Sequence, residues 1–116
     1  MDLNRLRELG GIVSSIPVKR EVSWGHLTDT GEEVTDTFTV HIRKHSCGTM
    51  ERFHSAHDAQ DKSGPALIIS ESVLLGEDGA EPIPYDVAFQ LDTRLARVLI
   101  DAINEVNGFG GITAKN

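Results

Sequence analysis

Four of the five histidines and the single cysteine gather in one stretch of the chain, and these side chains could hold a metal ion. The stretch contains His41, His45, Cys47, His54 and His57, and Asp58 follows it. Zinc binds nitrogen and sulfur ligands in tetrahedral geometry. However, the spacing matches no zinc-binding pattern, and one cysteine is a poor donor set for a structural zinc site. We therefore expect solvated histidines with no metal and no cofactor, and keep a metal-binding protein or metal-dependent enzyme as the alternative.

The sequence shows no complete set of groups for nucleophilic or acid–base catalysis. Cys47 lies close to histidines in sequence, which is one way to activate a thiol, but no oxyanion hole or orienting carboxylate is evident. The carboxylate pairs Glu32-Glu33 and Glu77-Asp78 lie in turn-like segments. Catalysis would require burial or a nearby charge to shift their pKa values. We therefore expect no catalytic residues and no enzymatic activity.

Composition indicates one soluble globular domain. The chain has 116 residues, of which 39% are hydrophobic and 25% charged, as in ordinary folded domains. A formal net charge of -7 disfavours nucleic acid as a partner, because phosphates are bound through Lys and Arg. No window is apolar enough to span a membrane, and the charged N-terminus does not resemble an export signal. Cys47 alone excludes an internal disulfide and fits a reducing cytoplasm.

The charge is unevenly distributed along the chain. Residues 1–20 carry four cationic and two acidic side chains, whereas residues 71–105 carry two and eight. Such asymmetry can guide subunits together head to tail, although it is more often only a solvated surface.

Two alternating segments predict a long β-hairpin over residues 17–43. In the second segment Val34, Phe38, Val40 and Ile42 share one face and threonines the other, which is typical of a half-buried antiparallel strand. An isolated hairpin is only marginally stable, so its apolar face needs a cover.

The middle of the chain predicts shorter elements. Residues 46–63 allow a short helix, and residues 66–75 favour a helical turn that passes into a strand at 72–75. The sequence from Gly76 to Gly79 is a turn signal, which returns the chain as a smaller hairpin.

Helices are expected over residues 84–91 and 93–107. The second carries an apolar stripe from Leu95 to Val106 at helical spacing, and Gly108 lies where a left-handed C-cap is expected. The predicted fold class is α+β, with both hairpins covered by these C-terminal helices. We expect one domain over residues 1–108 and a flexible tail over 109–116.

Four apolar side chains are the candidate partner-binding residues. Trp24 and Phe38 could line an apolar groove for a helical partner. Phe109 and Ile112 lie in the glycine-rich tail, where a core offers little reason for an apolar side chain; they could dock on a partner, and the alternative is that they pack back on the parent domain.

Several segments together resemble the tail assembly chaperones of long-tailed, siphophage-type bacteriophages. They are Pro-Val-x-x-Glu-Val-x-Trp at 17–24, Phe-Thr-Val-His-Ile-Arg-Lys at 38–44, Ala-Leu-Ile-Ile-Ser-Glu-Ser-Val at 66–73, Tyr-Asp-Val-Ala-x-x-Leu at 85–91 and Ala-Ile-Asn-Glu-Val-Asn-Gly at 102–108. The resemblance covers about residues 12–108.

The resemblance implies a non-enzymatic phage or prophage protein. Such chaperones bind the long tape-measure protein, keep it soluble in the host bacterial cytoplasm, form homo-oligomers around it, and are absent from the mature virion. A longer form made by ribosomal frameshifting recruits tail-tube subunits. A structural tail or head-completion subunit of the virion is the further alternative.

The last two residues suggest where such a frameshift would occur. Lys115-Asn116 can be encoded by AAA-AAC, on which both tRNAs can re-pair one base back. An AAG codon at Lys115 would exclude this hypothesis.

Overall fold

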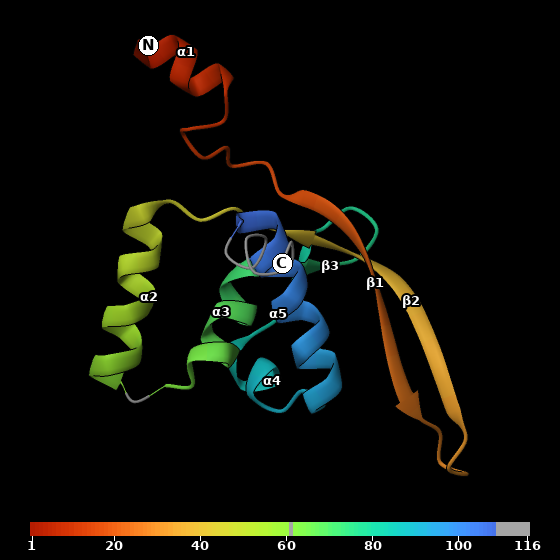
Figure 1. The fold of residues 1–116 in the computed structure, drawn as a ribbon. Helices are drawn as coiled ribbons and strands as arrows, with labels where there is room; N and C mark the ends of the chain where they lie inside the picture. Colours follow the sequence, from red (N-terminus) through yellow and green to blue (C-terminus); the bar gives the residue numbers. More distant parts are fainter. Residues whose placement is uncertain (61, 109–116) are drawn as a thin grey trace, which may run out of the picture.

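The computed structural model describes residues 1–60 and 62–108, and in this part of the chain a four-stranded antiparallel sheet is combined with five helices (Figure 1). The sheet order is β1-β2-β3-β4, so the α+β prediction is confirmed. The elements, in chain order, are α1 (Leu3–Glu8), β1 (Val18–Leu27), β2 (Glu33–Ile42), α2 (Cys47–Gln60), α3 (Gly64–Ser72), β3 (Val73–Leu75), β4 (Glu81–Pro82), α4 (Tyr85–Phe89) and α5 (Thr93–Asn107). The predicted tail, residues 109–116, lies outside the described residues.

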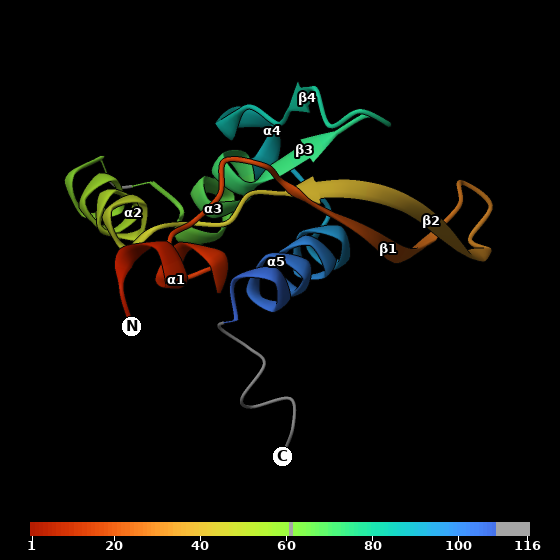
Figure 2. The same ribbon diagram turned by 90° about the horizontal axis from the view of Figure 1, so that it is seen from above.

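β1 and β2 form the long hairpin that the alternation predicts. They pair in register from Val18 opposite Ile42 to Leu27 opposite Glu33. Burial is confined to the half of the hairpin nearest the helices, where Val22, Val40 and Ile42 are buried. The other half extends beyond the helices (Figures 1 and 2).

Two polar residues interrupt the apolar face of the hairpin, and each has a partner. Arg20 Nε lies 3.2 Å from Glu105 Oε1 on α5, and Asp36 Oδ2 lies 2.6 Å from His26 Nε2 across the hairpin. A solvent-exposed ion pair contributes little to stability. The contact with Glu105 gives Arg20 a charged partner where the hairpin meets α5, and Asp36, which is exposed, has a hydrogen-bond partner on the neighbouring strand.

The ambiguous apolar run folds as predicted, as a helix followed directly by a strand. Ser63 Oγ accepts a hydrogen bond from the Ala66 amide at 3.3 Å, which caps the start of α3. After Ser72 the chain becomes β3, and its Leu74 pairs with both His41 on β2 and Pro82 on β4. The smaller hairpin is therefore confirmed.

α5 supplies the main cover of the hairpin. Leu99, Ala102 and Ile103 on its stripe are buried, and they belong to one core cluster with residues of the hairpin, α3, β3 and α4. Asp92 caps the start of the helix, and Gly108, whose φ of 80° is left-handed, caps its end. Both ends lie where the sequence predicts them.

The turn between β3 and β4 packs directly on β2, and this makes Gly79 sensitive to substitution. Gly79 has φ +70°, and a Cβ atom there would lie 2.7 Å from His41 Cγ. Gly31 has a similar φ of +85° but nothing within 4 Å. A side chain in the left-handed region costs about 1–2 kcal/mol, so Gly31→Ala should lose about that much. Gly79→Ala should lose at least about 1 kcal/mol more, because the His41 ring must also move.

Denaturant unfolding of both variants measures this difference. In a His41→Ala background the excess loss caused by Gly79→Ala should become smaller, because the ring atoms at 2.7 and 2.9 Å are gone and only the residue 41 Cβ at 3.0 Å remains. Equal losses at Gly79 and Gly31 would contradict the prediction.

Candidate partner-binding surfaces

The histidine-rich stretch does not converge on a metal site within the part of the chain that the structure describes. No group of three His, Cys, Asp or Glu side chains there could hold a metal ion. His41 lies beneath the Gly79 turn, and Cys47 is exposed. The side chains of His54 and His57 lie outside the described part of the structure.

His45 is engaged in packing rather than chemistry. Its Nε2 lies 2.6 Å from Ser72 Oγ, and its ring meets Phe53 edge-on with centroids 4.8 Å apart. Burial is the main cause that lowers the pKa of His45; Arg43 lowers it further, and Glu71 acts in the opposite direction. A lowered pKa favours the neutral imidazole at pH 7, which suits its half-buried position.

Trp24 lies where the hairpin meets the start of α5, and Phe38 packs against the core. The indole Nε1 of Trp24 donates to Asp92 Oδ2 at 3.1 Å, and its ring stacks on His26 with centroids 3.9 Å apart. Phe38 is partly buried against the core. Trp24 therefore links β1 to the start of α5, and a role in partner binding for either residue stays a prediction. Phe109 and Ile112 lie outside the described residues.

Asp92 joins three donors at this junction. Its carboxylate accepts hydrogen bonds from the Arg94 amide at 3.0 Å, the Leu95 amide at 3.1 Å and the Trp24 indole. The backbone hydrogen bond from Leu95 is the main cause that lowers the pKa of Asp92, followed by the bond from Trp24. Because the carboxylate is the hydrogen-bonded form, the cap is kept at neutral pH and is lost as the pH falls through this lowered pKa.

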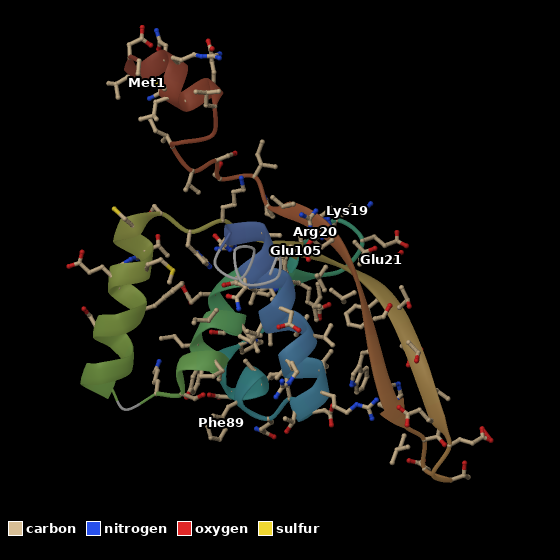
Figure 3. All side chains as sticks on the ribbon, viewed as in Figure 1. Met1, Lys19, Arg20, Glu21, Phe89 and Glu105 are labelled. Atoms are coloured by element: carbon tan, nitrogen blue, oxygen red, sulfur yellow. The ribbon has the colours of Figure 1, made fainter. Side chains whose placement is uncertain are left out.

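The first 16 residues, here called the arm, carry most of the exposed apolar side chains of the described chain. α1 has no buried residue. The arm extends away from the rest of the described chain, here called the body, with Met1 at its end (Figure 3). Leu3, Leu9 and Ile16 are 67%, 58% and 74% exposed. The other large apolar side chains exposed along the arm are Met1, Leu6, Ile12 and Val13. Because large exposed apolar surfaces often serve interactions, this concentration of exposed apolar side chains makes the arm a candidate partner-binding surface.

The arm has the local signals of a helix, but its helix buries no residue against the part of the chain that the structure describes. Asp2 Oδ1 accepts from the Arg5 amide at 2.8 Å, and Gly10, with φ 86°, follows the helix. A single isolated helix of six residues is too short to be stable in water. The stripe of Leu3, Leu6 and Leu9 is the sequence signal that could have identified this surface, and the four candidate partner-binding residues do not include it.

A smaller apolar patch lies on α4, apart from the arm (Figure 3). Val87 and Phe89 are 50% and 64% exposed. Tyr85 and Phe89 lie with ring centroids 6.1 Å apart. This patch is a matched comparison for the arm, because it presents apolar side chains on a helix whose opposite side is packed.

Among the described residues, none of the helices has the length and apolar character needed to cross a membrane. Residues 4–107 match the family model described as "Phage tail assembly chaperone, TAC". No curated protein and no solved structure gives a significant match.

Proposed function

Because the chain belongs to the phage tail assembly chaperone family, we propose that it is a non-enzymatic chaperone that binds the tape-measure protein during tail morphogenesis. It acts as a homo-oligomer in the cytoplasm of the host bacterium and is released before the virion is complete. A frameshifted extension of the chain helps to recruit tail-tube subunits. Membership of the family supports tail proteins in general as partners; the choice of the tape-measure protein is part of the proposal.

The exposed arm is the observation that carries this proposal. A tape-measure protein is long and largely helical, with apolar stripes that need covering before assembly. Burying one large aliphatic side chain gains about 1.5–3 kcal/mol, so several arm residues against one such stripe would offset the entropy of ordering the arm. The body, which contains the folded core, then carries the arm without unfolding.

Co-expression with the tape-measure protein of the same phage or prophage tests the proposed function. We expect the soluble fraction of that protein to rise several-fold when this chain is present, because the arm covers its apolar stripes. An unrelated acidic protein of similar size is the control. An unchanged soluble fraction would contradict the proposal, and finding this chain in purified virions would favour a structural subunit instead.

A further inference from the structure

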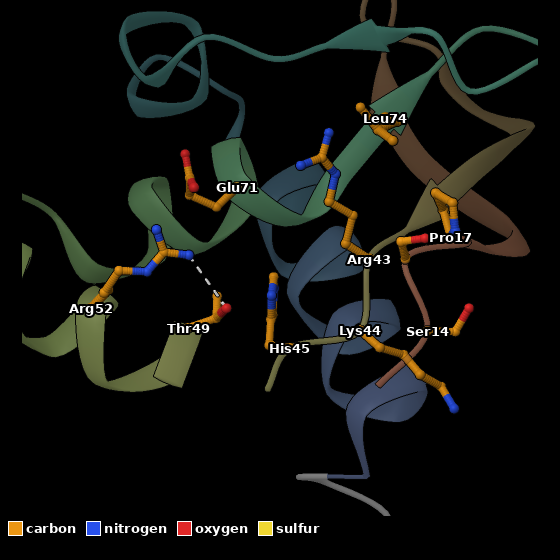
Figure 4. A pocket seen from close by; sticks show the side chains of 10 residues that line it. Ser14, Pro17, Arg43, Lys44, His45, Thr49, Arg52, Glu71 and Leu74 are labelled. Atoms are coloured by element: carbon orange, nitrogen blue, oxygen red, sulfur yellow. Dashed lines mark hydrogen bonds between the residues drawn. The ribbon is translucent and has the colours of Figure 1, made fainter. Parts of the chain in front are cut away.

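A cationic pocket lies where the arm meets the body. It is an open hollow of about 290 Å³, formed by the end of the arm, the segment after β2, the start of α2 and the end of α3. Arg43, Lys44 and Arg52 line it, with Glu71 as the only carboxylate among its lining residues (Figure 4). The pocket therefore concentrates positive charge on a protein of net charge -7.

The segment that carries this charge is held in place by hydrogen bonds. The Arg43 amide donates to Ser72 O at 2.8 Å, and Asn107 Nδ2 donates to Arg43 O at 3.3 Å. The Oδ1 atom of the same Asn107 accepts from the His45 amide at 2.8 Å. The last turn of α5 and the end of α3 thus fix the backbone between Arg43 and His45, so the pocket is preorganised.

The cations of the pocket are not neutralised by the side chains that the structure describes. None of Arg43, Lys44 and Arg52 belongs to one of the ion pairs found there. Arg52 donates to Thr49 Oγ1 at 3.4 Å, which is an uncharged partner. Arginine is well suited to carboxylate oxygens because its guanidinium can bind them in a bidentate way.

The tip of the β1–β2 hairpin has the opposite character. Residues 27–33, here called the acidic tip, contain Asp29, Glu32 and Glu33 and no cation. Glu33 is engaged by Arg94 at 2.7 Å, whereas no ion pair of the described residues includes Asp29 or Glu32. Leu27 at the neck of the tip is 60% exposed.

The tip is a narrow, hydrogen-bonded turn that extends beyond the helices. The Thr28 amide donates to Glu32 O at 2.8 Å, and the Gly31 amide donates to Thr28 O at 2.9 Å. Figure 1 shows the tip and the arm at opposite ends of an elongated molecule, whose principal extents are 59 × 34 × 32 Å. The cationic pocket and the acidic tip are therefore both present on one chain, but they cannot meet within it.

We propose that the acidic tip of one copy docks into the cationic pocket of a second copy, so that subunits associate head to tail. The carboxylates of Asp29 and Glu32 then face Arg43 and Arg52, and Leu27 meets the apolar base of the next arm. The contact specifies how the self-association proposed above is made, and in that respect it rests on the proposed function. Since the two surfaces differ, the contact is heterologous, and it builds an open chain or a closed ring rather than a two-fold dimer.

Two charge-reversed variants of the full chain test this contact. The pocket variant carries Arg43→Glu and Arg52→Glu, and the tip variant carries Asp29→Lys and Glu32→Lys; all four side chains are exposed. Sedimentation velocity over a concentration series should show wild-type protein associating, and less so at high salt. Each variant alone should have its self-association weakened about tenfold or more, because like charges then oppose each other at every contact.

Mixing the two variants gives the decisive result. The normal tip of the pocket variant fits the normal pocket of the tip variant, and the lysines of the reversed tip face the glutamates of the reversed pocket. An equimolar mixture should therefore recover the association that each variant alone has lost. A third variant, Asp86→Lys with Asp101→Lys, changes net charge as much as the tip variant does and should associate like the wild type. Circular dichroism confirms that each variant is folded.

A monomeric wild type, undiminished association of either single variant, or a mixture that stays monomeric would overturn the head-to-tail contact. An undiminished tip variant would mean that the pocket binds another anion. Solubilisation of the tape-measure protein is measured separately on the same variants. A monomeric wild type that still solubilises this partner overturns the contact alone, whereas an associating wild type that fails to solubilise it overturns the proposed function.

Discussion

Replacing Leu3, Leu6 and Leu9 together by serine is expected to abolish solubilisation of the tape-measure protein without lowering the stability of the chaperone. None of the three side chains is buried in the free protein, so the folded core loses nothing. Against a partner, each would contribute up to about 1.5–3 kcal/mol. Losing even half of that at three positions weakens binding roughly fortyfold or more.

Two measurements check this prediction on the same samples. The soluble fraction of the co-expressed partner should fall to the level seen without chaperone, while the unfolding midpoint of the variant stays within about 2 °C of the wild type. Val87→Ser with Phe89→Ser on α4 is the control, since it removes comparably exposed apolar side chains away from the arm. Full solubilisation by the arm variant would show that the arm does not bind the partner.

Ile103→Ala is expected to destabilise the chaperone more than any surface change. Ile103 is 1% exposed and lies in the core cluster where α5 covers the hairpin. Truncating a fully buried isoleucine removes its transfer free energy and leaves a cavity, which costs about 2–5 kcal/mol. A domain of this size is stable by only about 5–15 kcal/mol, so a large fraction of the total is lost.

Urea unfolding at constant temperature measures this loss, and thermal unfolding should show a midpoint lowered by about 10 °C or more. Ile103→Val, which removes a single methylene, should cost about 0.5–1.5 kcal/mol. Val87→Ala at a half-exposed position should change stability by less than about 0.5 kcal/mol. A loss below about 1 kcal/mol at Ile103→Ala would mean that α5 is not the main cover of the sheet.

The two experiments distinguish the contribution of the folded core from the contribution of the arm. A substitution at Ile103 should impair function only through loss of the folded state, whereas substitutions on α1 should impair function in a folded protein. This contrast is the clearest physical signature of a chaperone that binds through a segment outside its own core.

The fold bears on the metal-binding alternative that the sequence raised for the histidine-rich stretch. A metal-dependent role for the histidine stretch would require ligands that converge, yet His41 and His45 pack against different neighbours, a glycine turn and Ser72 respectively. The sequence suggested a cluster only because four histidines lie within seventeen residues of one another along the chain. In the fold, His41 lies on β2, whereas His45 lies after the end of that strand, just before α2.

Local patterns in the sequence were sufficient for most of the secondary structure. Alternation of apolar and polar residues over 34–43 predicts β2, and the stripe from Leu95 to Val106 predicts α5, together with Asp92 and Gly108 at its ends. Each of these signals depends on neighbours two to four residues apart, and burial of one face then reinforces them. The hairpin register follows from the same alternation, because a shift by one residue would turn Val40 and Ile42 to solvent.

Only the tertiary structure determined which apolar and charged side chains stay exposed and so are available to partners. Trp24, which the sequence offers as a binding residue, is engaged by Asp92, 68 positions further along the chain. The leucines of α1 could equally have belonged to a core by their spacing, but none of them is buried in the described structure. Arg43 and Arg52 come to line one pocket because α2 turns back beside α3. The physical reason is that a side chain's spacing determines the face on which it lies, whereas its burial depends on which distant element excludes water from that face.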